Sequence, residues 1–333
     1  MSLISIRLTA QYRSTQGSRK VLDDMRLDML PGEAVGLIGE SGSGKSTLAL
    51  ALLRLLQWKG GDSTGWILWK GRDLLQLPEW QMRQVRGKEI ALVLQSAATS
   101  LNPALKIETQ FQEAWRAHSK EKWAVGRERT CMLLSEVNLP SADGFLNRYP
   151  REVSLGQAQR VLIALSLLHQ PDLVIADEPT SALDVITQRE VLELLSRLQR
   201  EHDMATLFIS HDLLSVGAFC DRVAILKDGK IVEQGETGRI FNNPAHEYTR
   251  RLIEALPARP QAPPVMPRDE FGESLGNLSR LAEEDAGVPM MTMMTPALSK
   301  RVLEFPAILD GGPSCAEASK PSAEPNPLQP MKK

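Results

Sequence analysis

Cysteine is scarce in this sequence, and neither sign of charge dominates it. The three cysteines lie far apart and none has the C-x-x-C spacing, so they indicate neither a disulfide framework nor a zinc or iron–sulfur site. The formal net charge is −2 with 24% charged residues, which gives no strong basic field to attract nucleic acid or anionic lipid. We therefore expect a protein of a reducing compartment without a nucleic-acid partner.

Long apolar runs are missing as well. The longest uncharged apolar stretches, such as residues 161–168, are far shorter than the roughly 18 residues that a membrane span requires. Arg7 and Arg13 interrupt any apolar core of an amino-terminal signal peptide. These features predict a chain that stays in the cytoplasm.

Proline is unevenly distributed, and its distribution predicts a domain boundary. Only 8 of the 21 prolines precede residue 257, whereas 13 fall in the last 77 positions, among Ala, Ser, Glu and Met. Segments of this composition bury too little apolar surface to order themselves. We expect one globular domain over residues 1–256 and a proline-rich, disordered tail over residues 257–333.

Strand-like and helix-like segments alternate within the globular part. This alternation predicts an α/β fold in which helices cover a mostly parallel sheet. The strand candidates are residues 34–38, 90–94, 173–176, 206–209 and 223–226. Mainly helical patterns, best at residues 108–118 and 127–137, predict a helical subdomain at about residues 96–160. Short β-like segments in the first 35 residues and at residues 65–71 predict an antiparallel β flap.

The most specific motif follows the first predicted buried strand. It fits G-x-x-x-x-G-K-[ST] and consists of Gly39, Glu40, Ser41, Gly42, Ser43, Gly44, Lys45, Ser46 and Thr47. Its glycines let backbone N–H groups point at phosphate oxygens, Lys45 adds a charge near the β- and γ-phosphates, and the Ser46 hydroxyl can ligate Mg²⁺. The alternative is a Gly/Ser-rich turn that caps an ordinary helix. A helical pattern at residues 48–56 supplies the context of a phosphate loop, so we expect a bound nucleoside triphosphate.

An acidic pair ends another predicted strand. Residues 173–176 are apolar and lead into Asp177 and Glu178, and α/β sheets place their ligands at such strand ends. Asp177 would hold Mg²⁺ through water, and Glu178 would polarise the water that attacks the γ-phosphate. The pattern alone also fits a solvated acidic turn. Beside a phosphate loop, it favours triphosphate cleavage.

Three further runs carry a family resemblance. SLGQAQR at residues 154–160 precedes Glu178, PTSALD at residues 179–184 follows it, and SHD at residues 210–212 follows the next strand. This order and spacing resembles the nucleotide-binding subunits of ATP-binding cassette (ABC) transporters, over residues 3–256. The resemblance implies a P-loop NTPase fold of the ABC type, with ATP and Mg²⁺ as ligands.

Two local runs narrow the resemblance to one branch. TSLNP at residues 99–103 resembles a run of the dipeptide, oligopeptide and nickel uptake branch, and residues 241–257 resemble its P-x-H-P-Y-T-x-x-L ending, with Glu247 where proline is usual. The simpler interpretations are a proline-bounded loop and an amphipathic terminal helix. The branch implies uptake of peptides or related small solutes and metal chelates.

The resemblance also implies roles for single residues. Gln95 would touch Mg²⁺ and sense the membrane partner, and His211 would hydrogen-bond the γ-phosphate, with Lys45 and Glu178 completing the catalytic set. Tyr12, 27 residues before Gly39, would stack on adenine. Simpler interpretations are a solvated turn for Gln95, a helix-capping neighbour for His211 and an edge-strand aromatic for Tyr12.

The signature run departs from the family pattern. The family usually has L-S-G-G-Q, whereas Leu155 replaces the first glycine here. Ser154, Gly156 and Gln157 would contact the ATP held by a partner subunit, and Asp184 would link the two sites. The isobutyl group of Leu155 can obstruct a close backbone approach. We therefore expect the composite site built from this signature to hydrolyse ATP slowly.

The resemblance implies an assembly. Two ATP-binding subunits, identical or different, would close head to tail on two ATP molecules, and two separate membrane permease subunits would receive the motion through residues 96–102. A solute-binding protein outside the cell would take part indirectly, and this chain would sit peripherally on the cytoplasmic side of the inner membrane. The alternatives are a hydrolysis-poor regulatory subunit and a non-transport ABC ATPase that acts on DNA or ribosomes.

Overall fold

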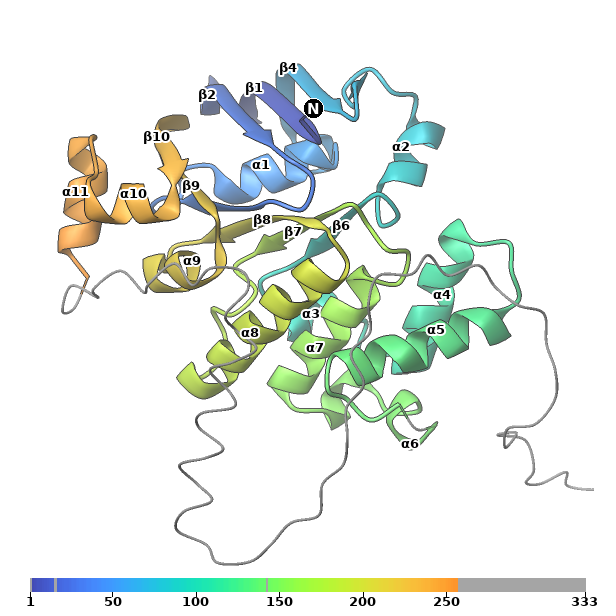
Figure 1. The fold of residues 1–333 in the computed structure, drawn as a ribbon. Helices are drawn as coiled ribbons and strands as arrows, with labels where there is room; N and C mark the ends of the chain where they lie inside the picture. The colour runs from blue at the N-terminus through green and yellow to red at the C-terminus, as the bar shows by residue number, and fades with distance from the viewer. Residues whose placement is uncertain (1, 15–16, 142, 257–333) are drawn as a thin grey trace, which may run out of the picture. The chain divides into compact units, whose positions relative to one another are not determined.

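The larger of two sheets has six strands (Figure 1). The computed structural model describes residues 2–14, 17–141 and 143–256, so the predicted tail lies outside the described residues. The six strands are β3 (Ala34–Ile38), β6 (Ile90–Val93), β7 (Leu173–Asp177), β8 (Ala205–Ser210), β9 (Arg222–Lys227) and β10 (Lys230–Glu236). Their order is β10-β9-β3-β8-β7-β6, and only β10 runs antiparallel to its neighbour.

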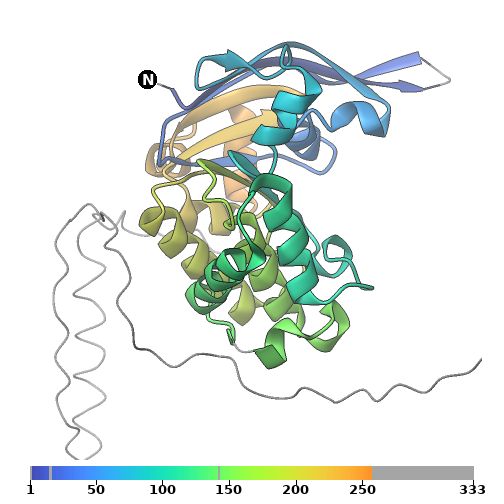
Figure 2. The ribbon, with the colours of Figure 1, turned by 90° about the vertical axis from the view of Figure 1, so that its right-hand side faces the viewer.

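The smaller sheet is antiparallel and has the order β2-β1-β4-β5. Its strands are β1 (Ile4–Ser14), β2 (Gly17–Met29), β4 (Gly61–Trp69) and β5 (Arg72–Asp73). The long hairpin of β1 and β2 extends beyond the rest of the sheet (Figure 2). These strands correspond to the predicted antiparallel flap.

Helices fill the connections between the strands. Those before β7 are α1 (Lys45–Leu52), η1 (Leu56–Lys59), α2 (Glu79–Val85), α3 (Ala97–Ser100), α4 (Ile107–His118), α5 (Trp123–Glu136), α6 (Asp143–Leu146), η2 (Pro150–Glu152) and α7 (Leu155–Ser166). Those after β7 are α8 (Val185–Glu201), α9 (Leu213–Phe219), α10 (Thr237–Asn242) and α11 (Glu247–Glu254). Where the prediction places a helical subdomain, α3 to α7 join β6 to β7. In the described ranges, no helix has the length and apolarity needed to cross a bilayer.

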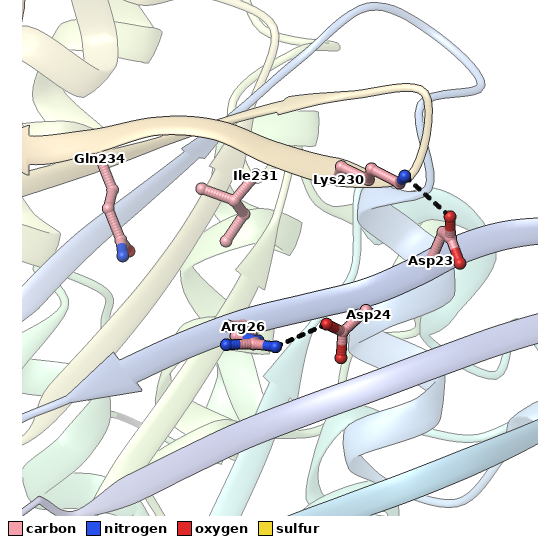
Figure 3. Close-up of a pocket in the computed structure, with 6 residues that line it drawn as sticks. All are labelled: Asp23, Asp24, Arg26, Lys230, Ile231 and Gln234. Carbon is pink, nitrogen blue, oxygen red and sulfur yellow. Dashed lines mark hydrogen bonds and ion pairs between the residues drawn. The ribbon is translucent and has the colours of Figure 1, made fainter.

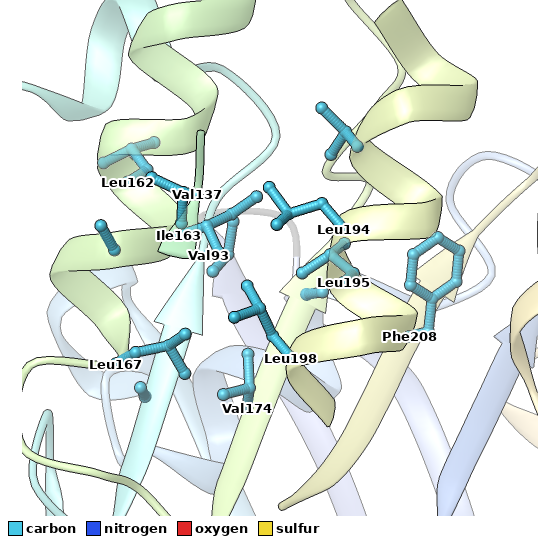
Figure 4. Packing of buried hydrophobic residues seen from close by; sticks show 14 of the residues in the cluster. Val93, Val137, Leu162, Ile163, Leu167, Val174, Leu194, Leu195, Leu198 and Phe208 are labelled. Carbon is cyan, nitrogen blue, oxygen red and sulfur yellow. The ribbon is translucent and has the colours of Figure 1, made fainter. Parts of the chain in front are cut away.

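The six-stranded sheet separates two apolar clusters. On β7, Val174 and Ala176 pack into the cluster that α7 and α8 cover, whereas Leu173 and Ile175 face the cluster that contains α1 and the antiparallel sheet. Figure 4 shows Val174 of β7 below Leu198 of α8, and Phe208 of β8 beside α8. Burial on both faces explains why these strands are continuous apolar runs. The same burial holds the strands in place, and with them the polar residues of the site at the strand ends.

The structure differs from the sequence expectation at the helix after the phosphate loop. The predicted helical pattern covered residues 48–56, but α1 spans Lys45–Leu52. Arg54 has φ 51°, a left-handed conformation that ends a regular helix. Leu56 is nevertheless buried, because η1 returns it to the core. Apolar spacing therefore predicted burial correctly and the end of the helix wrongly.

Candidate functional site

The phosphate-loop motif connects β3 to α1. Gly42 and Gly44 have φ angles of 83° and 112°, which side chains with a Cβ rarely adopt. Gly39 is needed for space, because a Cβ there would lie 2.3 Å from the Leu226 carbonyl oxygen. The loop thus opens at the carboxyl end of a parallel strand and closes on a helix amino terminus, where backbone N–H groups attract anions.

Lys45 is held inside this loop. It is 6% exposed, and its ammonium donates hydrogen bonds to the carbonyl oxygens of Gly39 (2.7 Å) and Glu40 (3.0 Å). Burial lowers the Lys45 pKa, while the charges of Glu178 and Asp177 raise it and oppose that shift. An ammonium held only by neutral carbonyls is available to a phosphate, which is a stronger acceptor.

Asp177 ends β7 facing the loop, with one carboxylate oxygen unused. Its side chain is buried, and Oδ1 has no hydrogen-bond partner. Burial raises the Asp177 pKa, whereas a hydrogen bond with Ser46 lowers it. Ser43 Oγ in the loop is also buried without a partner. Buried polar atoms in native proteins normally have partners, so this pair fits a site that a ligand completes.

Glu178 stands between two other predicted site residues. Gln95 Nε2 donates to its Oε2 at 2.9 Å, and His211 Nδ1 lies 3.0 Å from its Oε1. A carboxylate only accepts, so Nδ1 carries the proton in this contact and Nε2 of a neutral ring is free to accept. Glu178 has φ 49°, a conformation that is uncommon for a side chain of this size. Such backbone strain occurs at functional sites.

The signature residues lie elsewhere, at the start of α7. Ser154 caps this helix reciprocally with Gln157: the Gln157 N–H donates to Ser154 Oγ (3.2 Å), and the Ser154 N–H donates to Gln157 Oε1 (3.0 Å). Gly156 packs on Thr187 of α8, because a Cβ on Gly156 would lie 2.8 Å from the Thr187 methyl carbon. Leu155 is 39% exposed.

Asp184 caps α8 beside this segment. It accepts hydrogen bonds from the Thr187 N–H (3.1 Å) and Thr187 Oγ1 (2.7 Å), and hydrogen bonding by Thr187 lowers its pKa. A hollow of about 450 Å³ is lined by both helix starts, including Ser154, Gly156 and Asp184. The predicted site residues therefore form two groups: one around Lys45, and one at the starts of α7 and α8.

Tyr12 contacts neither of these two groups through a hydrogen bond or ring contact among the described residues. It lies on β1 opposite Gly61 of β4, and its half-buried ring packs into the cluster of the antiparallel sheet. A Cβ on Gly61 would lie 3.1 Å from the ring. Adenine stacking by Tyr12 stays a prediction.

A second hollow, of about 360 Å³, lies between β2 and β10 (Figure 3). Lys230 pairs with Asp23 at 3.0 Å and Arg26 with Asp24 at 2.7 Å. Hydrogen bonds from Arg7 and Arg26 lower the pKa of Asp24 to about 2. These charges satisfy one another, so the four charged residues that line the hollow present no unpaired charge to a ligand.

Known proteins with this fold are ATP-binding cassettes. A dimeric cassette, MJ0796 bound to ADP and phosphate, aligns with a TM-score of 0.61 and 26% identity over 70% of this chain and 98% of its own. The fold and the loop at Lys45 thus define a P-loop ATPase of the ABC type, and the predicted mostly parallel sheet with an antiparallel flap is confirmed.

Sequence relatives identify the family. A family model described as ABC transporter matches residues 22–181. A putative peptide import ATP-binding protein of Brucella abortus is 42% identical over 250 residues, 75% of each chain. The oligopeptide transport ATP-binding protein OppD of Bacillus subtilis is 39% identical over 75% of this chain and 70% of its own. This chain belongs to the ABC transporter family, as the motifs predicted, and is an ATPase.

A longer relative matches over part of its length. The peptidoglycan transport ATP-binding protein YejF of Agrobacterium fabrum is 44% identical over 257 residues, which are 77% of this chain but 47% of the relative. This chain therefore spans about half the length of that relative.

Leu155 gives a first testable prediction. Under the expectation from the family resemblance that the signature faces a partner's nucleotide, Leu155→Gly in an assembled transporter should raise the ATP hydrolysis rate by up to about tenfold, roughly 1.4 kcal/mol in the barrier, because the partly exposed isobutyl group is removed. Leu155→Ala distinguishes the effect of side-chain size from that of glycine's backbone flexibility, because it removes the isobutyl group and keeps a Cβ. Steady-state ATPase rates measure both, and an unchanged rate in Leu155→Gly would remove the hypothesis.

Proposed function

We propose that this chain couples ATP binding and hydrolysis to the import of peptides, or of related small solutes and metal chelates, through separate membrane subunits. The observation that carries the proposal is the grouping of Glu178 with Gln95 and His211 at the strand ends, next to Lys45 and Asp177. The names of the Brucella and Bacillus relatives support peptides as cargo.

Each residue of the Lys45 group has a distinct task in this proposal. Lys45 moves from loop carbonyls to the β- and γ-phosphates of ATP, which the loop N–H groups also bind. Glu178 accepts a hydrogen bond from the attacking water and aligns it. His211 donates a ring N–H to the γ-phosphate, because phosphate oxygens only accept; with Nδ1–H directed at Glu178, this requires a proton on Nε2 as well, so both ring nitrogens are donors in this state. Preorganised groups of this kind act mainly by positioning and electrostatic stabilisation.

Mg²⁺ is part of the proposed site. Within the described ranges, no three His, Cys, Asp or Glu side chains are grouped as a metal site. The fitting ligand set is instead Ser46 Oγ, the Gln95 amide oxygen and the unpaired Asp177 carboxylate, directly or through water, in keeping with the oxygen preference of Mg²⁺. When bound, the ion neutralises charge on the phosphates. Asp177 must be ionised for this task.

The assembly is proposed as a head-to-tail pair of ATP-binding subunits with two permease subunits. The separation of the signature group from the Lys45 group supports this arrangement, because a partner's nucleotide can then occupy the hollow at α7 and α8. The dimeric state of the MJ0796 cassette is consistent with such a pair. Residues 96–102, which include α3, would contact the permeases on the cytoplasmic side of the inner membrane.

Transport by the complete assembly tests the proposal. The chain should copurify with permease subunits, and inverted membrane vesicles or proteoliposomes containing both, with a solute-binding protein on the opposite side, should move peptide only when ATP is supplied. Vesicles without this chain are the control. Peptide movement that is equal with and without ATP would contradict the proposed function, even if the isolated chain hydrolyses ATP.

A further inference from the structure

The helix α11 begins near the phosphate loop although it is distant in sequence. Its amino terminus is fixed by the Glu233 carboxylate, which accepts hydrogen bonds from the N–H groups of Ala245 (2.7 Å) and His246 (3.0 Å). Tyr248 in the first turn is 7% exposed and belongs to the larger apolar cluster. The position of its ring is therefore set by the core and not by solvent.

Tyr248 lies against the first residues of the loop. The Lys227 ammonium is 4.7 Å from the centroid of its ring, and the neighbouring Leu226 carbonyl closes on Gly39. Burial raises the Tyr248 pKa, and hydrogen bonding to the Glu40 backbone opposes that rise. The ring lies next to Lys227, and Leu226, the residue before it, abuts Gly39, so the phenol is close to the start of the loop at Glu40. Its oxygen is buried without a hydrogen-bond partner of normal geometry.

Glu40 is an unusual neighbour for a triphosphate. It is the only acidic residue in the motif at residues 39–47, and its carbonyl oxygen shares the Lys45 ammonium with Gly39. When Lys45 turns to a phosphate, that carbonyl loses its partner and the start of the loop is free to adjust. A carboxylate beside bound phosphates repels them, and at Glu40, which is exposed, water screens part of that repulsion.

The buried phenol can remove this conflict. A hydroxyl without a partner in a buried place favours any conformation that supplies an acceptor. Glu40 and Asp228 are the carboxylates whose charges act on Tyr248, and of the two only Glu40 belongs to the phosphate loop. We propose that Tyr248 is a positioning residue, which donates its hydroxyl to Glu40 and holds that carboxylate away from the bound triphosphate. The inference rests on ATP binding at this loop and assigns α11 a part in it.

A single-atom deletion tests the inference in the full chain. Tyr248→Phe keeps the packed ring and is expected to raise the Kd and KM for ATP about 3- to 10-fold, the range for one lost hydrogen bond. The kcat should stay within twofold, because the residue touches no reacting atom. Ile253→Val, on the same helix, shortens a buried side chain and is the packing control. It should lower the melting temperature slightly and leave ATP affinity unchanged.

Rescue by a second substitution separates positioning from a general structural role. If Tyr248 acts on the Glu40 charge, adding Glu40→Gln to Tyr248→Phe should restore ATP affinity to within twofold of the wild type. Normal affinity in Tyr248→Phe, equal losses in Ile253→Val, or failure of the rescue would each overturn the inference and leave the proposed function standing. Lack of ATP binding by the wild-type chain would instead overturn the proposed function.

Discussion

Glu178→Gln is expected to lower the kcat for ATP hydrolysis about 10²- to 10⁴-fold, the usual contribution of a general base, while ATP remains bound. The amide keeps the size of the side chain, and its oxygen can accept from Gln95; its NH₂ group can donate to His211 Nδ1 once the ring proton moves from Nδ1 to Nε2. Only the negative charge that attracts the water proton is lost. Steady-state hydrolysis and equilibrium binding of labelled ATP measure the two effects separately.

A matched change elsewhere controls for the loss of one acidic charge. Glu193 lies on α8 and forms an exposed pair with Arg189 at 2.9 Å, an interaction typically worth less than about 1 kcal/mol. Glu193→Gln should leave both kcat and ATP binding within twofold of the wild type. Turnover retained by Glu178→Gln would refute the role of Glu178 as the base.

Lys45→Ala is expected to weaken ATP binding on the order of 10²-fold and to abolish measurable hydrolysis at ordinary ATP concentrations. The change removes the buried cation of the loop, and charge-assisted hydrogen bonds contribute about 1.5–3 kcal/mol each. It also leaves the carbonyl oxygens of Gly39 and Glu40 without their donor. Isothermal titration of ATP with Mg²⁺, at matched ionic strength, measures the loss.

The control for this change is another lysine outside the site. Lys59 ends η1 and is exposed, so Lys59→Ala removes the same charge without touching the loop. Thermal unfolding of both variants in the absence of nucleotide shows whether the fold persists. A folded Lys45→Ala variant that binds ATP with wild-type affinity would exclude the phosphate-loop assignment.

Buried strands were the most predictable elements. The expected strand at residues 34–38 matches β3, and those at residues 173–176 and 206–209 fall within one residue of β7 and β8 at each end. Burial on both faces makes such strands read as continuous apolar runs. The antiparallel strands are longer than expected. Their full length was hard to recognise in the sequence because β2 alternates exposed charges with buried residues and so lacks a continuous apolar run.

Contacts between segments that are distant in sequence were predictable only where the segments carry motifs of one known family. The family resemblance anticipated that Gln95, Glu178 and His211 serve one site, although no local spacing requires their hydrogen bonds. The proximity of Tyr248 to Glu40 had no such signal, because Tyr248 stood in a run that was notable only for its branch resemblance. Tertiary packing alone brings α11 to the loop.

The start of α8 also determines how this chain behaves by itself. Val185 and Ile186 follow the Asp184 cap and are 82% and 74% exposed, so two consecutive aliphatic side chains stand in water on a rigid helix end. Water disfavours such surface in proportion to its area. We therefore expect isolated chains to associate through this end of α8 as their concentration rises, and strongly salting-out anions such as sulfate to promote the association.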